Sequence, residues 1–289
     1  MPGQLLLHAP TTLEYFGSLV ADDATFSVLE TAIAITHVDQ PALDCQSVLA
    51  EIDTLAARLK TRLPSDAGAM QRLRLLNRFF FQELGFAGNV NDYYDPKNSY
   101  VPDVLQTRRG IPITLAVLYV EIASQVGLSA CGISFPGHFL VKVRMPQGDV
   151  VIDPFTGQSM SRDALDILLV PYRRRQGLPG NSQLPLALFL QEAAPREVIA
   201  RMLRNLKEIH RSTEDWPRLL AVLDRLVILL PSAWDERRDR GLAAAELGAV
   251  QPAVADLSAY LEHAPLAPDR TAIAERLVEL GHGDPSRFH

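Results

Sequence analysis

The chain has 289 residues, a hydrophobic share of 47% and a formal net charge of -6 at pH 7. This length allows one large domain or two smaller ones with a sizeable buried core, and we expect two domains. The acidic balance argues against nucleic acid as a partner, because that binding requires clustered Lys and Arg side chains.

The two cysteines, Cys45 and Cys131, are too few for a disulfide framework and too few for a zinc site without histidine help. The N-terminal stretch Met1–Leu7 has no basic region before its apolar run. No uncharged apolar stretch approaches the ~20 residues that span a bilayer. We therefore expect a cytoplasmic protein with reduced thiols, no membrane partner, no cofactor and no metal.

Apolar residues at helical spacing predict three helices in the first third of the chain. They cover residues 26–36, the segment between Pro41 and Pro64, and residues 69–84. The next segment, 88–103, is rich in Asn, Asp and Pro, which indicates an irregular loop.

Pro112 stands where a first helical residue belongs, so a helix is predicted over 113–126. Runs of β-type residues follow, at 130–135, 138–145 and 149–153, the last two joined by a turn at 146–148. A helix followed by an antiparallel meander indicates the α+β class. The turn puts His138 and Asp153 on one face, with a four-residue offset.

Beyond Pro195 the pattern is helical and repeats with a period of 34 residues, which matches the tetratricopeptide repeat. Gly241 and Ala253 fall where helices of such a repeat pack closely, whereas the first repeat carries Lys207 and Leu219 there. A last helix over 269–280 caps two repeats. We expect one domain over 1–194 and a helical tail over 195–289.

Two charged runs carry no predicted chemistry. Arg173–Arg175 is expected to be a solvated loop, because short charge runs are usually solvent-exposed. The run 234–240 alternates charges at helical spacing, which favours an exposed ion-paired face or a seam against the first domain.

Four short motifs resemble the transglutaminase-like superfamily, specifically the bacterial SirB family, in which such a domain precedes a tetratricopeptide tail. They are Asn98-Ser99, Arg109-Gly110-Ile111-Pro112-Ile113, Pro136-Gly137-His138-Phe139 and Ile152-Asp153-Pro154-Phe155. The resemblance implies a papain-like core in which a cysteine opens a helix, a histidine begins a strand and an aspartate ends the next. His138 and Asp153 match, but the cysteine position falls at or beside Pro112 and holds no cysteine.

Three residues are weighed as substitutes for that nucleophile. Thr114 lies in the first helical turn, where a hydroxyl more often bonds the backbone. Cys131 is expected to pack in the core, as free cysteines usually do. Cys45 is expected to be a packing residue without a partner histidine.

Three functions remain open. The favoured one is a protein without enzyme activity that binds a peptide or small ligand in a cleft at His138 and Asp153, lined by Asn98, Arg109 and Pro112. The repeat tail then binds a partner protein. The second is a hydrolase or acyl transferase that uses Thr114 or a water activated by His138. The third is an inert first domain whose repeats are the only binding module.

Overall fold

The computed structural model describes residues 10–177 and 185–281. Its internal contacts divide the chain into two compact units. The central unit spans Thr25–Met202, and the helical unit combines Met1–Ala24 with Leu203–His289. The sequence-based boundary at residue 194 stays a prediction, and the stretch Met1–Leu7 lies outside the described residues.

The central unit begins with the three predicted helices, which the structure confirms as α2, α3 and α4 at Val28–Ile35, Cys45–Lys60 and Ala69–Asn77. Side chains cap the first two helices, because Ser27 accepts from the N–H of Glu30 and Asp44 accepts from that of Gln46. A π-helical turn, η2 at Arg78–Glu83, extends α4 to the predicted end of the third helix.

The segment predicted as an irregular loop contains regular structure. It holds part of β1 (Ala87–Gly88), a 3-10 turn η3 (Pro96–Ser99) and the start of α5 (Val101–Thr107). The prediction was wrong here because Pro96 and Pro102, interpreted as loop formers, both occupy the first turn of a helix, where a missing N–H costs nothing.

Strand β1 pairs in parallel with β2 (Arg109–Gly110), which leads directly into α6 (Pro112–Gln125). Helix α6 confirms the prediction for this segment. It is buried around most of its circumference, with Leu115, Leu118 and Ile122 at 0% exposure. α6 is therefore the central helix of this unit.

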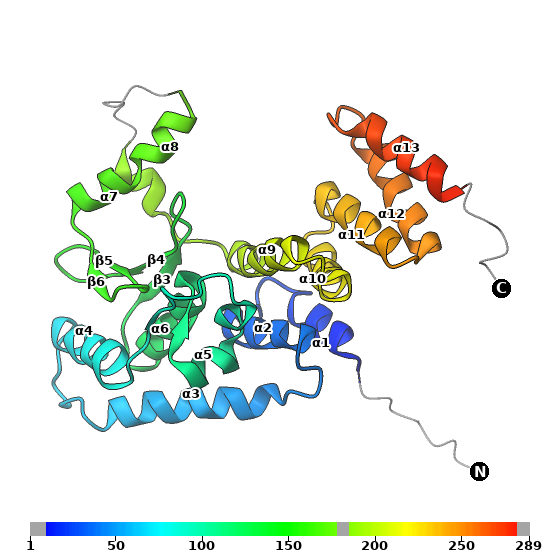
Figure 1. The fold of residues 1–289 in the computed structure, drawn as a ribbon. Helices are drawn as coiled ribbons and strands as arrows, with labels where there is room; N and C mark the ends of the chain where they lie inside the picture. The colour runs from blue at the N-terminus through cyan, green and yellow to red at the C-terminus, as the bar shows by residue number, and fades with distance from the viewer. Residues whose placement is uncertain (1–9, 178–184, 282–289) are drawn as a thin grey trace, which may run out of the picture. The chain divides into compact units, whose positions relative to one another are not determined.

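The antiparallel sheet has the order β3-β4-β5-β6, with strands at Ala130–Ile133, Leu140–Val143, Val150–Asp153 and Gln158–Ser159. Its two faces are both apolar. Ile133, Leu140 and Val151 form a cluster with Leu165 of α7 (Arg162–Leu168) on one face. α6 packs against β3 and β4, and Figure 1 shows the sheet between α6 and α7. The observed helix and sheet content confirms the α+β class.

The β4-β5 hairpin differs from the predicted one in register. Val143 pairs with Val150, so six residues, 144–149, connect the strands. Extending the observed register by one pair sets Leu140 opposite Asp153, two residues from His138. The longer connection therefore halves the expected offset between His138 and Asp153.

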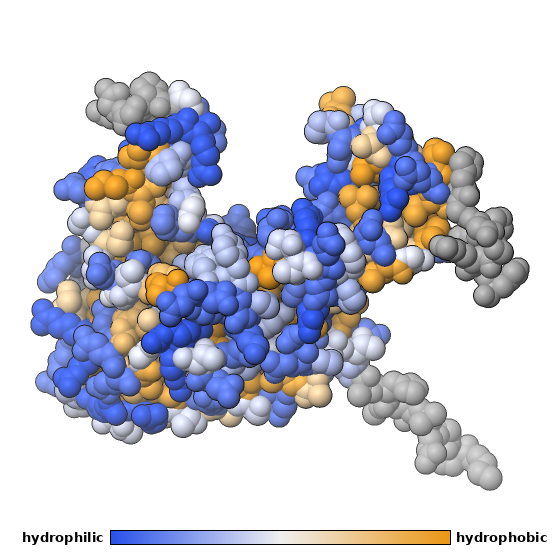
Figure 2. All heavy atoms as spheres, viewed as in Figure 1, coloured by the Kyte–Doolittle hydropathy of each residue, from blue (hydrophilic) through white to orange (hydrophobic). Residues whose placement is uncertain are grey.

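The basic cluster is not a loop. Arg173–Arg175 forms the last turn of α8 (Val170–Arg175), where cations stabilise the helix C-terminus. Arg173 is 9% exposed and pairs with Asp166 of α7 at 3.0 Å. By contrast, Ile167 of α7 is 68% exposed. Figure 2 shows hydrophobic residues at the surface over this helix.

The segment after the undescribed residues runs along the edge strand β3. It begins as a 3-10 turn, η4 at Leu186–Leu190. Lys142 donates from Nζ to the Leu190 carbonyl at 2.7 Å, and the Ala193 N–H donates to the Gly132 carbonyl at 2.9 Å. Backbone groups of this segment thus occupy part of an otherwise open sheet edge.

The helical unit contains α1 (Thr12–Leu19), the end of α9 (Pro195–Ser212), and α10 to α13 at Trp216–Leu229, Trp234–Glu246, Val250–His263 and Arg270–Gly281. A shift of 34 residues carries both ends of α10 onto those of α12, which confirms the predicted period. A Cβ at Gly241 would lie 2.9 Å from Leu257, so the helix contact requires the small residue. In the described ranges, no helix is long and apolar enough to cross a membrane.

Candidate functional site

The start of α6 is held in place by the backbone of the preceding loop. The Ile111 N–H donates to the Asn98 carbonyl at 3.2 Å, and Pro112 occupies the first helical turn. Pro112 is only partly buried. The position at which the resemblance expects a nucleophile is therefore accessible but carries a proline ring.

Thr114 lies two residues further along, still in the first turn of α6, and its side chain faces the protein interior. Its exposed fraction is 0%, and its hydroxyl has no hydrogen-bond partner among the described residues. Ser99 is also 0% exposed, and its hydroxyl likewise has no hydrogen-bond partner among the described residues. A buried hydroxyl does not meet a substrate in this conformation, and leaving it unpaired costs about 1–3 kcal/mol.

Asn98, expected to line a cleft, is 3% exposed and uses its amide within the protein. Its Nδ2 donates to the carbonyls of Asp92 and Tyr93 at 2.7 and 3.2 Å. Its Oδ1 accepts from Asn89 at 3.0 Å. Asn98 therefore fixes the loop that carries Tyr93.

Arg109 is exposed and binds backbone carbonyls. Its Nη1 donates to Gly85 at 2.6 Å and to Arg108 at 2.9 Å. Gly85 has a φ of +74°, the conformation that ends the preceding helical turn, so Arg109 holds that turn against β2. In this structure the guanidinium is engaged by the chain itself.

His138 lies in the tight turn that precedes β4. Gly137 has a φ of +74°, and the His138 N–H donates to the Phe135 carbonyl at 2.9 Å, closing the turn. The residue is partly exposed. The turn sets the imidazole just outside the sheet, where alternation along the strand no longer fixes its direction.

Asp153, at the end of β5, caps the next turn. Its Oδ1 accepts from the Phe155 N–H and its Oδ2 from the Thr156 hydroxyl, both at 2.9 Å. Within residues 10–177 and 185–281, no hydrogen bond or ion pair joins Asp153 to His138. The hairpin brings the two residues to one end of the sheet, and the carboxylate is occupied by its own turn.

The structure brings a histidine to Cys45, contrary to the expectation from the sequence. Cys45 opens α3, and its Sγ lies 3.7 Å from Nε2 of His37 in the 3-10 turn η1 (Thr36–Val38). The same Nε2 lies 3.0 Å from the Leu43 carbonyl, which can only accept, so this nitrogen carries a proton. Hence it is not placed to take a proton from the thiol. Cys45 and His37 are 6% and 9% exposed.

Cys131 lies on β3 and is 7% exposed, in agreement with the predicted packing role. Burial raises the pKa of its thiol, and the Glu192 carboxylate raises it further. Because the thiolate is the nucleophile, both effects lower the reactivity of Cys131. Metal ligands are not evident either, since the described part of the chain holds no group of three or more His, Cys, Asp or Glu residues suited to a metal ion.

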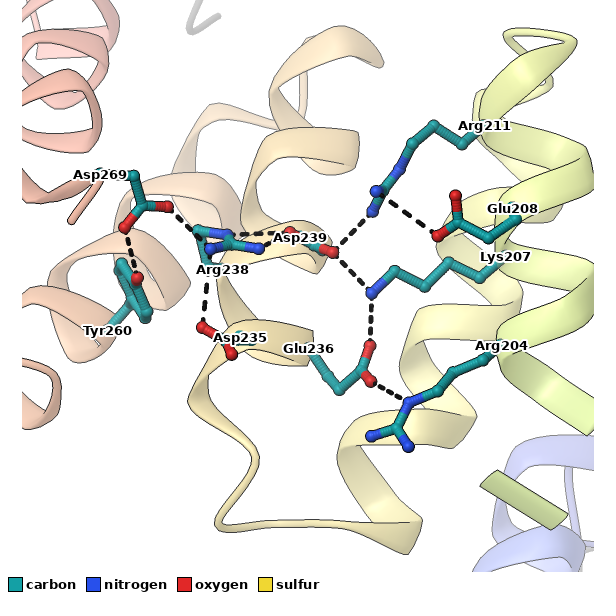
Figure 3. Close-up of polar contacts among 10 residues, drawn as sticks. All are labelled: Arg204, Lys207, Glu208, Arg211, Asp235, Glu236, Arg238, Asp239, Tyr260 and Asp269. Atoms are coloured by element: carbon teal, nitrogen blue, oxygen red, sulfur yellow. Dashed lines mark hydrogen bonds and ion pairs between the residues drawn. The ribbon is translucent and has the colours of Figure 1, made fainter. Parts of the chain in front are cut away.

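The charged run 234–240 is ion-paired, as predicted, but two of its carboxylates are buried rather than exposed. Glu236 and Asp239 of α11 are 4% and 7% exposed. Lys207 of α9, itself 7% exposed, pairs with both carboxylates at 2.6 and 2.5 Å. Figure 3 shows Lys207 pointing between them. The lysine that breaks the small-residue pattern of the first repeat is therefore neutralised by two carboxylates of α11.

The ion pairs continue from this centre. Arg204 and Arg211 of α9 bind the two carboxylates from outside, Arg238 joins Asp239 to Asp269, and the Tyr260 hydroxyl donates to Asp269 at 2.6 Å (Figure 3). Beside this network lies a cavity of about 490 Å³ lined by residues including Arg211, Trp216, Leu242 and Glu246. Its lining is mixed, with both apolar and charged side chains.

Comparison with known protein families agrees with this architecture. The profile described as the transglutaminase-like superfamily matches residues 46–204, and that of the tetratricopeptide repeat matches residues 206–278. The chain is a transglutaminase-like protein with a tetratricopeptide-repeat region.

Curated relatives define the family more closely. A UPF0162 protein of Xylella fastidiosa is 35% identical over 90% of this chain and 92% of its own. A UPF0162 protein of Pseudomonas aeruginosa is 30% identical over 91% and 94%, and protein SirB1 of Salmonella typhimurium 26% over 82% and 86%. The chain belongs to this SirB family of UPF0162 proteins. The comparison with solved structures found no match.

Proposed function

We propose that this protein is a transglutaminase-like protein without a catalytic cysteine, which binds a peptide or small ligand at the site around His138 and Asp153. The helical unit binds a partner protein, and the protein acts in the cytoplasm. It is a binding or regulatory protein rather than an enzyme.

One observation carries the proposal. Pro112 stands at the start of α6, where a cysteine of the superfamily would benefit from the positive end of the helix dipole. The two cysteines of the chain open α3 and lie within β3, and both are buried. Neither is on the helix from which the superfamily nucleophile acts.

The hydrogen bonding of Asp153 also supports the proposal. A catalytic aspartate orients its histidine through a direct hydrogen bond. Both oxygens of Asp153 instead accept bonds from residues of the following turn. That arrangement suits a structural remnant of a catalytic pair around which a ligand-binding surface persists.

The enzyme alternative requires Thr114 or a water activated by His138. Thr114 is 0% exposed, so attack by its hydroxyl would need the first turn of α6 to open. A water bound to His138 needs no such opening, and the partly exposed imidazole makes this version testable.

For the helical unit, the supporting observation is the cavity of about 490 Å³ beside the ion-pair network. Tetratricopeptide repeats generally mediate contacts between proteins. If the repeats were the only binding module, a Trp216→Ala or Leu242→Ser variant would lose a protein partner, while His138→Ala would change nothing. The proposal expects both units to contribute.

The experiment combines the full chain with a glutamine-containing peptide and a primary amine, and follows ammonia release and covalent product. We expect neither, and we expect the same null result after alkylation and in a Cys45→Ala, Cys131→Ala double variant. In parallel, peptide binding is measured by calorimetry with the wild type and His138→Ala. Turnover that disappears in His138→Ala or after removal of one cysteine would refute the proposal in favour of an enzyme.

A further inference from the structure

Arg201, near the middle of α9, contacts the turn that carries His138. Its Nη1 donates to the Ser134 hydroxyl at 3.0 Å, and its guanidinium lies 5.4 Å from the centre of the Phe139 ring. Ser134 and Phe139 bracket the turn, and Phe139 is the residue after His138. The guanidinium is therefore fixed beside the candidate site by two contacts of the central unit.

The Arg201 guanidinium has no carboxylate partner within the described ranges 10–177 and 185–281. Among the residues that the structure describes, Arg201 takes part in no ion pair, although it is partly buried. Burial lowers its pKa, and only the Tyr93 phenol opposes that effect. A partly desolvated cation without a counter-charge favours any anion that reaches it.

A group of aromatic rings, the aromatic wall, lies within electrostatic range of Arg201. The Tyr93 ring lies 6.0 Å from the Phe155 ring and 5.4 Å from the Tyr94 ring, and Arg201 acts electrostatically on its phenol. Tyr93 and Tyr94 are 44% and 76% exposed. Large aromatic side chains at such exposure are typical of binding surfaces rather than of a monomer's ordinary surface.

The wall is held before any ligand arrives. Asn98 binds the Tyr93 carbonyl, and the Asn89 Oδ1 accepts from the Asp92 N–H at 3.1 Å. The Phe155 carbonyl accepts from the Gly88 N–H at 2.8 Å, so β1 fixes the second ring. A preorganised surface loses little entropy on binding.

From this arrangement we propose that Arg201, Tyr93 and Phe155 form a carboxylate-binding subsite of the His138 site. It takes a peptide in which a carboxylate adjoins an aromatic side chain. The guanidinium fork binds the two carboxylate oxygens, and the aromatic side chain packs on the rings. The inference rests on the proposed function, since it specifies the ligand of the same site.

A singly charged group suits the subsite better than a phosphate. Arg201 supplies one positive charge, whereas Asp92 precedes Tyr93 directly and Asp153 lies two residues before Phe155. A dianion would meet more repulsion from these two carboxylates than a carboxylate does. The carboxylate can be a free C-terminus or the side chain of Asp or Glu.

The test titrates the full chain with three acetylated dipeptides: Ala-Tyr with a free C-terminus, the same peptide amidated, and amidated Tyr-Glu. The two acids distinguish the two sources of the carboxylate. We expect at least one acid to bind about tenfold or more tightly than amidated Ala-Tyr. Arg201→Gln abolishes that ratio, Arg201→Lys restores part of it, and Tyr93→Ala weakens all peptides alike.

Arg74→Gln serves as the matched control, because it removes one exposed positive charge from α4 in the same unit and should leave the ratio unchanged. Circular dichroism verifies that each variant is folded. Equal binding of the acids and the amide would overturn the carboxylate subsite while leaving the proposed ligand site standing. If none of the peptides bound, both proposals would be contradicted.

Discussion

The helical unit and the central unit differ in whether a buried positive charge is paired with carboxylates. In the helical unit Lys207 is 7% exposed and contacts two carboxylates, Glu236 and Asp239, which further arginines also bind. In the central unit Arg201 is partly buried and has a hydroxyl and a ring as neighbours. A buried charge that is paired is satisfied within the fold, whereas a partly buried charge without a counter-charge remains available to an anionic ligand.

The strongest challenge to this contrast is Lys207→Met. It leaves two buried carboxylates short of a partner, and we expect a loss of about 3 kcal/mol in the free energy of unfolding. Arg204, Arg211 and Arg238 keep the loss at the lower end of the usual range. The two tryptophans, Trp216 and Trp234, both lie in the helical unit, so their fluorescence follows its denaturation.

Arg204→Gln is the control for that measurement. Arg204 binds the same Glu236, but its side chain is 51% exposed. Solvent-exposed pairs contribute ~0–1 kcal/mol, so this variant should lose less than 1 kcal/mol. Equal losses in the two variants would mean that the buried position of Lys207 has no special weight.

Acid should weaken the helical unit through the same network. Burial raises the pKa of Asp239, but the hydrogen bonds and charges of Lys207 and Arg238 outweigh it and hold the pKa below its usual value. The stabilisation is therefore complete above the unfolded value of ~3.9 and is lost as the pH falls through the lower folded value. Tryptophan fluorescence should detect acid unfolding below about pH 4.

Asp239→Asn sharpens this measurement, because it removes the titrating group from the network. The variant should be less stable at neutral pH and lose less further stability on acidification. An unchanged pH dependence would assign the acid sensitivity to other carboxylates, such as Asp269, whose pKa the Tyr260 hydroxyl lowers.

In the central unit, Gly88→Ala tests the preorganised aromatic wall. A Cβ at this position would overlap the Phe155 ring. Overpacking typically costs about 1–3 kcal/mol, and calorimetry should show a lower melting temperature for this unit. Adding Phe155→Leu should recover part of the stability but not the peptide binding. Recovery of both would remove Phe155 from the proposed subsite.

The smallest expected effect is that of Thr114→Val. Replacing an unpaired buried hydroxyl by a methyl group of similar shape should be neutral or stabilise the protein by up to about 1 kcal/mol. Peptide binding should not change. If Thr114→Val lost peptide binding or an enzyme activity of the wild type, Thr114 would have to be a functional residue.

Long periodic segments were predictable from the sequence, and short or non-local features were not. The apolar spacing of α3 and α6, and the 34-residue repeat, follow from patterns within one element. The strands β1 and β2 have two residues each, too few for any alternation. The β4-β5 register depended on a connection whose length the Pro-Gln-Gly turn signal understated.

The candidate site was also predictable only in the part that depends on local sequence patterns. The predicted turn set His138 and Asp153 on one face with a four-residue offset, and the observed register reduces that offset to two residues. The His37–Cys45 contact was missed because the chain reverses between η1 and α3, which brings together residues that helical spacing does not pair. Arg201 was missed because its neighbours Ser134 and Tyr93 are distant in the sequence, and only packing reveals an unpaired cation.

The short segment along β3 bears on how this protein avoids self-association. An open strand offers its N–H and C=O groups to any other extended chain, which is a common route to aggregation. Here the Ala193 N–H donates a hydrogen bond to the Gly132 carbonyl of β3, and Lys142 of the neighbouring strand β4 donates one to the Leu190 carbonyl. Two proteolytic cuts that excise residues 186–193 would uncover this edge. The nicked protein should then form soluble oligomers or fibrils that the intact chain does not.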